Sequence, residues 1–152
     1  MKQMLFLLLT MILVLPVCLA DGLALTEVDV HVDYDDAYTY RLEGRRRPDS
    51  GTAFNNSVIG VDVLPGSNIT FTLRIENTFQ GDSSTIREVF ATITIEEIDD
   101  GDDLEERSLD FDLEAGNEDR VDVKFNMPLN VDEGTYDVKI EVEGQGKNDT
   151  SF

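Results

Sequence analysis

Two runs of alternating residues near the C-terminal end constrain the fold most. Apolar side chains occupy every second position in Val121–Met127 and again in Tyr136–Val142. Because successive side chains of a β-strand point to opposite faces, each run predicts a strand with one buried face. The connection between them, Pro128–Thr135, is too long for a two-residue hairpin turn and too polar for a core helix. We therefore predict that it carries the chain from one sheet of a sandwich to the other.

The same alternation predicts five strands upstream of this region, separated by turn residues. They are Glu27–Asp33, Val58–Val63, Asn68–Glu76, Arg87–Glu97 and Leu109–Leu113. Residues 35–56 show no sustained period and are expected to form a long loop, with a short extended piece at Tyr38–Leu42. About seven short strands without a convincing helix predict an all-β protein, an antiparallel β-sandwich. A barrel is the alternative architecture.

Three local features of these strands carry further expectations. Pro65-Gly66 predicts a tight turn, because proline fixes the first turn position and glycine tolerates positive φ at the next. Phe90 falls on the polar side of its strand, which predicts cover from a neighbouring loop or chain. Charged residues on the outward faces of the last two strands, such as Lys124 and Asp137, are expected to lie near one another.

The first 20 residues have the pattern of a secretory signal peptide. Lys2 supplies a short positive start, and the apolar run Met4–Leu15 is too short for a membrane anchor. Small side chains at Cys18 and Ala20 predict cleavage after Ala20, and an uncleaved anchor is the alternative. We expect a signal peptide helix ahead of the sandwich, and an extracellular or cell-envelope location without membrane insertion after cleavage.

The length fits one domain behind this signal peptide. We assign residues 1–20 to the signal peptide, 21–57 to an N-terminal strand and long loop, 58–144 to the sandwich, and 145–152 to a tail or linker. About 130 residues are enough to bury one hydrophobic core. Cleavage would remove the only cysteine, Cys18, so we expect neither a disulfide nor thiol chemistry in the exported chain.

The charge balance limits the possible partners. The chain has 32 acidic and 12 basic side chains, which gives a net charge of −20. Such a surface repels nucleic-acid phosphates and anionic lipid headgroups, so we expect no nucleic-acid partner. It attracts cations, and high salt would screen the repulsion that opposes a compact state.

Three segments carry a likeness to a known family: Leu64–Asn77, Ile93–Leu104 and Pro128–Tyr136. They resemble the immunoglobulin-like modules of archaeal S-layer-related surface proteins, which are similar to the bacterial adhesion-related (CARDB-type) sandwich. The resemblance covers about Val58–Gly144. It implies a seven-stranded Greek-key sandwich, export to the cell envelope, and a structural or adhesive role without catalysis.

Within the resemblance, Tyr136 is similar to the tyrosine-corner residue of immunoglobulin-like folds. That residue stands two positions before the second cysteine of antibody domains, and Val138 occupies the cysteine position here. The resemblance therefore implies a tyrosine corner without the disulfide.

Three sequons predict N-glycosylation sites at Asn55, Asn68 and Asn148. Asn68 falls on the outward face of its predicted strand, and the other two lie in predicted loops. Occupancy of at least one site requires a host that glycosylates such sequons.

Two acidic groups are candidates for cation binding. Asp99, Asp100, Asp102 and Asp103 could offer oxygens to Ca²⁺, but their spacing does not fit an EF-hand loop, and a solvated turn is the alternative. Asp29, His31 and Asp33 share one strand face and could form a loose transition-metal site, or simply an exposed acidic face. We expect no other cofactor.

The remaining motifs give little support for catalysis. The sequence has no Gly-x-Ser-x-Gly, no His-Glu-x-x-His and no phosphate-binding loop. Arg45–Arg47 is the only basic cluster, and we expect a solvated loop there, with a processing site or a dock for the acidic face of another copy as the alternatives. We therefore expect a non-enzymatic surface module whose partners are other envelope proteins or copies of itself. An adhesin-like module that binds carbohydrate or peptide is the alternative.

Overall fold

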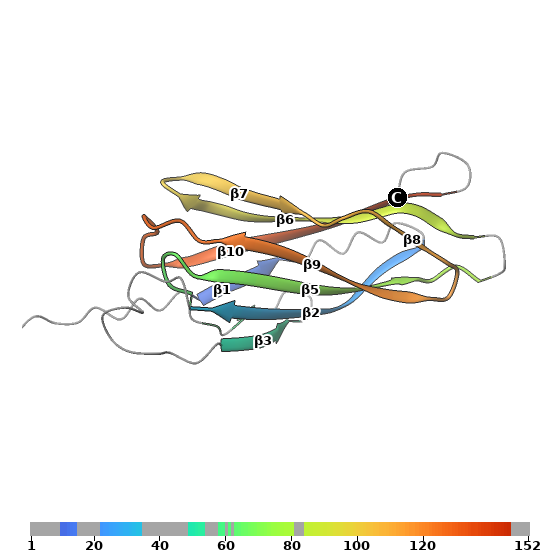
Figure 1. Ribbon diagram of the computed structural model, residues 1–152, viewed down its shortest axis with the longest axis horizontal. Coiled ribbons are helices and arrows are strands. Elements are labelled where there is room, and N and C mark those ends of the chain that lie inside the picture. The colour runs from blue at the N-terminus through green and yellow to red at the C-terminus, as the bar shows by residue number, and fades with distance from the viewer. Residues whose placement is uncertain are drawn as a thin grey trace, which may run out of the picture.

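The computed structural model describes residues 10–14, 22–34, 49–53, 58–59, 61, 63–80 and 84–146. Within these residues, ten strands form two sheets packed face to face (Figure 1). In chain order they are β1 (Thr10–Val14), β2 (Leu23–Asp33), β3 (Asp49–Ala53), β4 (Val58–Ile59), β5 (Asn68–Asn77), β6 (Ile86–Asp99), β7 (Asp102–Arg107), β8 (Phe111–Leu113), β9 (Glu118–Asn126) and β10 (Thr135–Gln145). The predicted all-β sandwich is confirmed.

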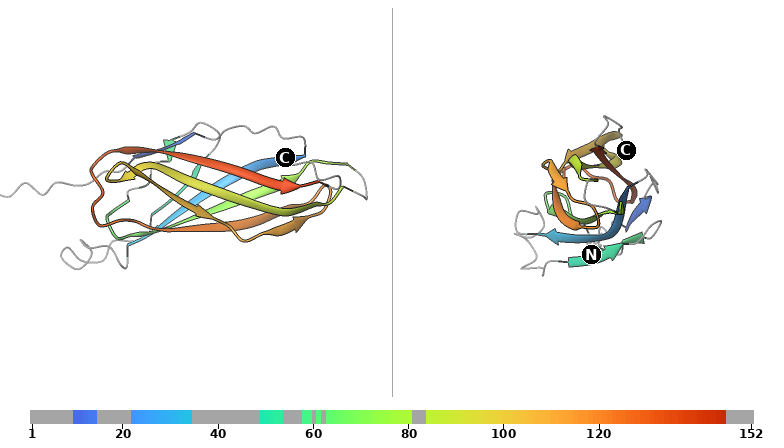
Figure 2. Two further views of the ribbon diagram at one scale, coloured as in Figure 1. Left: turned by 90° about the horizontal axis from the view of Figure 1, so that it is seen from above. Right: turned by 90° about the vertical axis from the view of Figure 1, so that its right-hand side faces the viewer.

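The two sheets differ in strand order. One runs β4-β1-β10-β6-β7, with β8 also paired to β6, and the other runs β3-β2-β5-β9. We call these the β10 sheet and the β5 sheet. Their pairings are antiparallel except for β1 with β10, which is parallel. The layers are visible end-on in the right panel of Figure 2.

The connection between β9 and β10 crosses from one sheet to the other, as its length and polarity predicted. β9 pairs with β5, whereas β10 pairs with β6 and β1. The expectation that Lys124 and Asp137 lie near one another is wrong, because their strands belong to different sheets. Lys139 instead pairs with Glu141 of its own strand at 2.8 Å, and this hydrogen bond and charge raise the pKa of Lys139.

The seven predicted strands correspond to β2, β4, β5, β6, β8, β9 and β10, with shifted ends. β4 is shorter than predicted, although Val61 and Val63 beyond it are buried. β8 begins at Phe111, and Leu109, predicted to point inward, is 89% exposed. Buried Ser108 takes the inward place and holds its segment to β6 through two hydrogen bonds to the backbone of Ala91, of 2.9 and 3.0 Å.

Three strands were not predicted from the sequence: β1, β3 and β7. The signal peptide helix is wrong for Thr10–Val14, which form β1 between β10 and β4. An apolar run fits a buried strand as well as a helix, so tertiary pairing decides between them. β3 lies in the expected long loop, while the extended piece predicted at Tyr38–Leu42 lies outside the described residues.

The core lies between the two sheets and is almost entirely apolar. Alternate residues of β5 are fully buried, and Phe71 packs edge to face against Phe125 of β9, with ring centroids 5.7 Å apart. From β6 and β10 the opposing layer adds Ile93, Ile95 and Val138. Since each such side chain contributes about 1.5 to 3 kcal/mol on burial, the core is the largest stabilising contribution to folding.

The predicted turn before β5 is confirmed by its hydrogen bond. The N–H of Ser67 donates to the carbonyl of Leu64 at 3.0 Å, and Gly66 has a φ of 79°. Proline followed by glycine at positive φ is the pattern of a type II turn. The N–H of Gly66 also donates to the carbonyl of Met127, which ties this turn to the end of β9.

Candidate functional site

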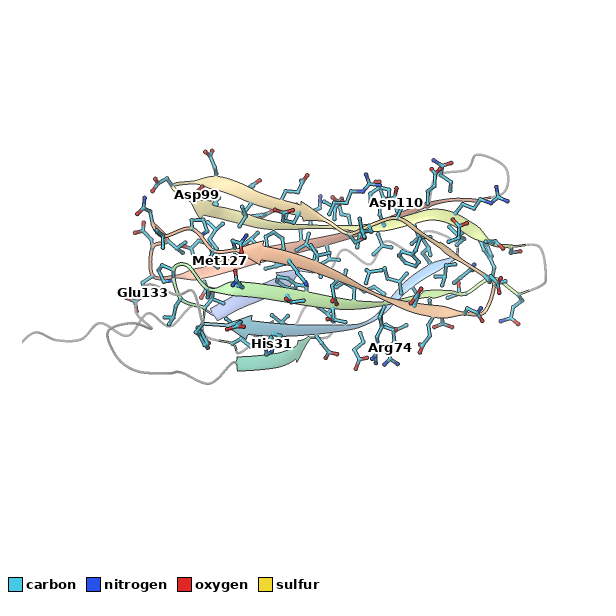
Figure 3. The ribbon with its side chains drawn as sticks, viewed as in Figure 1. His31, Arg74, Asp99, Asp110, Met127 and Glu133 are labelled. Carbon is cyan, nitrogen blue, oxygen red and sulfur yellow. The ribbon has the colours of Figure 1, made fainter. Side chains whose placement is uncertain are left out.

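The four aspartates considered as calcium ligands form the tip of the β6–β7 hairpin. Asp99 pairs with Asp102, and Asp100-Gly101 make the two-residue turn between them. Both turn residues have positive φ, 52° and 94°, which is the requirement of a type I′ hairpin turn and the reason for the Asp-Gly sequence. All four aspartate side chains are exposed, and Asp99 is seen at the outer end of β6 in Figure 3.

The carboxylate of Asp103 has a local structural partner. Its Oδ1 accepts a hydrogen bond from the N–H of Glu97 at 2.9 Å, at an irregularity where Glu97 has a φ of 55°. The same arrangement recurs at the other end of β6. There the N–H of Glu88, with a φ of 50°, donates to Oδ1 of Asp112 in β8 at 3.1 Å. Two aspartates of neighbouring strands therefore fix the two irregular points of β6.

Neither acidic group is gathered into a metal site. In the part of the chain that the structure describes, no three His, Cys, Asp or Glu side chains are arranged to hold a metal ion. Asp29, His31 and Asp33 lie along the outer face of β2, and His31 points away from the core in Figure 3. The four turn aspartates are exposed to solvent, whereas Asp29 and Asp33 are half-buried on either side of the exposed His31. Cation binding at either group stays a prediction, which titration with metal ions tests.

One of the three sequons lies within the described residues. Asn68 begins β5 and is half-buried on the outer face of the β5 sheet, opposite Asp33 of β2 and Asn126 of β9. Thr70 of the same sequon lies on that face, because Ile69 between them is fully buried. The sequons at Asn55 and Asn148, and the Arg45–Arg47 cluster, lie outside the described residues.

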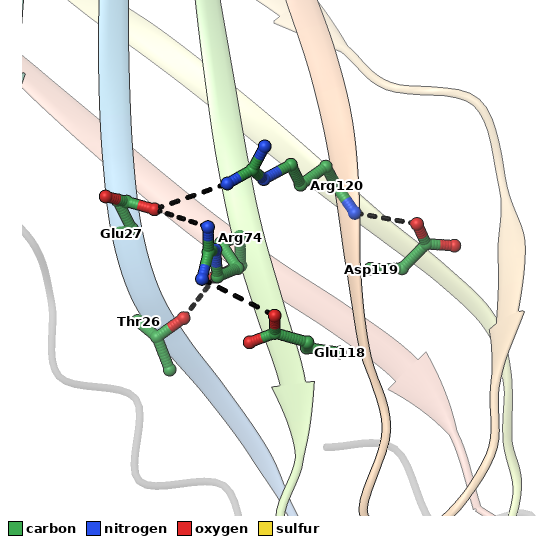
Figure 4. Close-up of polar contacts among 6 residues, drawn as sticks. All are labelled: Thr26, Glu27, Arg74, Glu118, Asp119 and Arg120. Carbon is green, nitrogen blue, oxygen red and sulfur yellow. Dashed lines mark hydrogen bonds and ion pairs between the residues drawn. The ribbon is translucent and has the colours of Figure 1, made fainter.

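A cross-strand charge network occupies the other end of this outer face (Figure 4). Arg74 of β5 contacts Glu27 of β2 at 3.1 Å and Glu118 of β9 at 3.4 Å, and Arg120 lies 3.9 Å from the same Glu27 oxygen. The hydroxyl of Thr26 donates to the carbonyl of Arg74 at 3.2 Å. Exposed pairs of this kind add little stability, so the network chiefly fixes the pairing of three strands.

This network was missed from the sequence. Alternation places each of its residues on an outward face, but only the strand register makes Glu27, Arg74 and Arg120 direct neighbours. The sequence feature that could have predicted the network is Arg74, which is the one basic residue of β5 and lies between Thr72 and Glu76 on the outward face. An unpaired arginine at a half-buried position predicts acidic residues on both flanking strands.

Buried polar side chains in the described residues serve the backbone. Asn77, at the end of β5, donates from Nδ2 to the carbonyls of Ser84 and Leu113 at 2.8 and 2.9 Å. Its Oδ1 accepts from the N–H of Phe79 at 3.1 Å, so one amide joins three segments. Ser67 bonds within its turn, donating to the carbonyl of Leu64 at 2.7 Å.

The expected tyrosine corner has its hydrogen bond. The hydroxyl of Tyr136 donates to the carbonyl of Asp132, four residues upstream, at 2.7 Å. Partial burial and the nearby Asp132 carboxylate raise the pKa of Tyr136 above its ordinary value of 10.0. The bond fixes the last part of the crossing between the sheets, which is the role of such a corner in immunoglobulin-like folds.

Phe90 is covered by a neighbouring strand rather than by a loop. The guanidinium carbon of Arg107 in β7 lies 3.5 Å from the centroid of the Phe90 ring. Arg107 also pairs with Asp110 at 2.6 Å, which holds the cation in place over the ring. The outward phenylalanine therefore has a partner within its own sheet.

Comparison with known proteins identifies no relative. No protein-family model, no curated protein and no solved structure matches the chain significantly. Among the described residues, no helix combines the length and the apolar character needed to cross a membrane.

Proposed function

We propose that the protein is a non-catalytic, exported module of the cell envelope that has a structural or interaction role, as in archaeal S-layer-related surface proteins. The observation that carries this proposal is the use of the buried polar side chains. Asn77, Ser67 and Ser108 lie at three separate places, and each is bonded to the backbone. In the described residues these groups hold strands and turns together instead of converging on one point, as catalytic groups do.

The surface supports the same role. The outer face of the β5 sheet consists mainly of threonines, asparagines and charged residues on three hydrogen-bonded strands, backed by an almost entirely apolar inner face. A rigid polar sheet with a net charge of −20 over the chain stays dissolved among envelope glycans and salts. The sequon at Asn68 lies on this face, where an attached glycan would point away from the core.

Fractionation of the native host tests the proposal. Antibody detection should find the protein with washed envelopes, in a form whose mass and N-terminal sequence correspond to a chain that begins at Asp21. We call this chain the exported form. Detection only in the soluble interior of the cell, with Met1 or Lys2 at the N-terminus, would contradict the proposal. A shift in mass after deglycosylation would also show that at least one sequon carries a glycan.

A ligand-binding module is the second candidate, because several exposed segments meet at one end of the sandwich. The β6–β7 turn and the β9–β10 loop lie at the same end in Figure 1, and Leu129 in that loop is 65% exposed. Loops at the end of a rigid sandwich commonly carry recognition. A glycan and peptide array with the exported form distinguishes the two. Saturable binding that is lost in a Leu129→Ser variant would favour recognition over a structural role.

A further inference from the structure

The first residues of β10 depend on β1 for their strand pairing. β10 pairs with β6 only from Val138 onward, whereas its pairs with β1 run from Thr135 to Lys139. Within the described strands, Thr135, Tyr136 and Asp137 therefore have β1 as their ladder partner. Without β1, this part of β10 is an open edge whose backbone donors and acceptors lack partners.

β1 lies between two strands, β10 and β4, and we call the position between them the seat of β1. β1 lies parallel to β10, with Leu13 at the register position of the buried Val138, and it also pairs antiparallel with β4 through Met11 and Ile12. Both neighbouring strands therefore lose hydrogen bonds when β1 leaves. Because sheet edges of this kind accept an added strand through main-chain bonds, the seat is specific for an extended segment.

The sequence predicts that the residues of β1, Thr10–Val14, are removed with the signal peptide. Export would therefore open the edge that β1 fills in the whole chain. We propose that the Thr135–Lys139 edge of β10 is a strand-acceptor site, filled in the exported form by an extended aliphatic segment of another envelope protein lying parallel to β10. The inference rests on the proposed function for the export that removes β1 and for the identity of the protein that supplies the segment.

Two observations favour an aliphatic strand of a different protein over a second copy of this chain. The present occupant has the sequence Thr-Met-Ile-Leu-Val, so the seat takes a wholly uncharged segment in parallel register. Two copies would bring together edges that expose Asp137 on chains that each carry a large negative charge. Like charges at a direct cross-strand position are destabilising.

The first test opens the edge in the full chain. An Ile12→Pro/Leu13→Pro variant removes two successive N–H groups that point to opposite sides of β1, so at least one bond to β10 is lost. The probe is a fluorescent peptide with the sequence of Leu9–Leu15 between lysine pairs. We expect saturable binding to the variant, at least about tenfold tighter than to the unsubstituted chain, whose edge is filled.

A matched control peptide carries proline at the positions of Ile12 and Leu13 and keeps the lysines, so it has the same charge. Equal binding of both peptides would show electrostatic attraction and overturn the proposal. No binding to a folded variant would also overturn it. So would a dimer of the variant, seen by sedimentation, that the peptide does not disperse, because a second copy would then occupy the edge.

A second measurement does not require the proline variant to fold. In the full chain with Cys18→Ser, an Ile12→Cys/Asp137→Cys pair stands in direct register and should form a disulfide on mild oxidation. A Leu13→Cys/Asp137→Cys pair, one residue out of register, is the control. Equal cross-linking of both pairs, or of neither, overturns the seat of β1. Both measurements use purified protein, so a failure of export would contradict the proposed function without affecting them.

Discussion

Among the buried polar side chains that the structure describes, that of Asn77 makes the most hydrogen bonds. Its amide joins the end of β5 to Ser84, Leu113 and Phe79. Replacement by alanine leaves two carbonyls and one N–H without their partner. Since each unsatisfied buried group costs about 1 to 3 kcal/mol, and the loops can partly relax toward water, we expect a loss of about 2 to 4 kcal/mol.

Urea denaturation measures this loss, with Asn126→Ala as the control. Asn126 lies at the exposed end of β9, where substitution should change the unfolding free energy by less than about 0.5 kcal/mol. Equal effects of the two substitutions would contradict the anchoring role of Asn77.

Tyr136→Phe tests the corner hydrogen bond. Loss of the bond to Asp132 should lower the unfolding free energy by about 1 kcal/mol at neutral pH. Because the folded state raises the pKa of Tyr136, it holds the phenolic proton more tightly than the unfolded state does. Stability from this group is therefore complete below pH 10 and is lost as pH rises through the folded pKa.

The phenylalanine variant lacks this proton, so its stability should fall less steeply above pH 10 than that of the unsubstituted chain. Urea denaturation at a series of alkaline pH values compares the two slopes. Parallel slopes would show that Tyr136 titrates alike in the folded and unfolded states.

At the scale of the elements, the β6–β7 hairpin depends on the positive φ of its turn. Gly101→Ala should cost about 1 kcal/mol or more, since a φ of 94° strains an L-residue, although the new methyl group meets nothing within 4 Å. Gly134→Ala is the matched control, because Gly134 has no such φ and its added methyl group would make only ordinary contacts. Thermal unfolding should show a lower midpoint for the first variant alone, and equal midpoints would contradict the turn type.

The alternation of apolar and polar residues predicted the strands that have one buried and one solvent-facing side. It missed the strands whose two sides have the same character. β5 alternates half-buried and buried side chains along its whole length and was predicted almost to the residue. β7 has the sequence Asp-Asp-Leu-Glu-Glu-Arg and is exposed at nearly every position, so only its hairpin pairing with β6 makes it a strand. β1 lacks alternation for the opposite reason, since its residues after Thr10 are all apolar.

The candidate sites followed a similar division. The turn at Asp100-Gly101 depends on local sequence and could be predicted, whereas the hydrogen bond of Tyr136 was implied only by the resemblance to immunoglobulin-like modules. The Arg74 network and the cover of Phe90 by Arg107 join residues far apart in the chain. Their prediction needs the register of neighbouring strands, which a single sequence does not specify.

At the scale of the whole molecule, the net charge of −20 should make stability depend on salt. Raising NaCl from about 10 mM to 1 M shortens the screening length from about 30 Å to about 3 Å, so repulsion among the carboxylates weakens. Calorimetry should show a rising unfolding temperature. A falling temperature would mean that the Arg74 network and similar ion pairs outweigh the repulsion.

Calorimetry with divalent cations distinguishes general charge screening from calcium binding at Asp99–Asp103. For a solvated turn, Ca²⁺ and Mg²⁺ at equal concentration should raise the unfolding temperature equally. A rise specific to Ca²⁺ that disappears in an Asp99→Asn/Asp102→Asn variant would establish the calcium site instead. Glu106→Gln/Glu143→Gln, which removes two exposed carboxylates outside the turn, is the control for charge removal.

In the proposed strand-acceptor site, export removes β1 and leaves the β10 edge open. Hydrogen exchange followed by NMR tests it directly on the full chain and the exported form. We predict that amides of Thr135–Lys139 that bond to β1 are protected in the full chain, exchange at least about tenfold faster in the exported form, and regain protection with the Leu9–Leu15 peptide. Amides of β5 should stay protected throughout. Equal protection of the β10 edge in both forms, or no change in protection on addition of the peptide, would contradict the proposed strand-acceptor site.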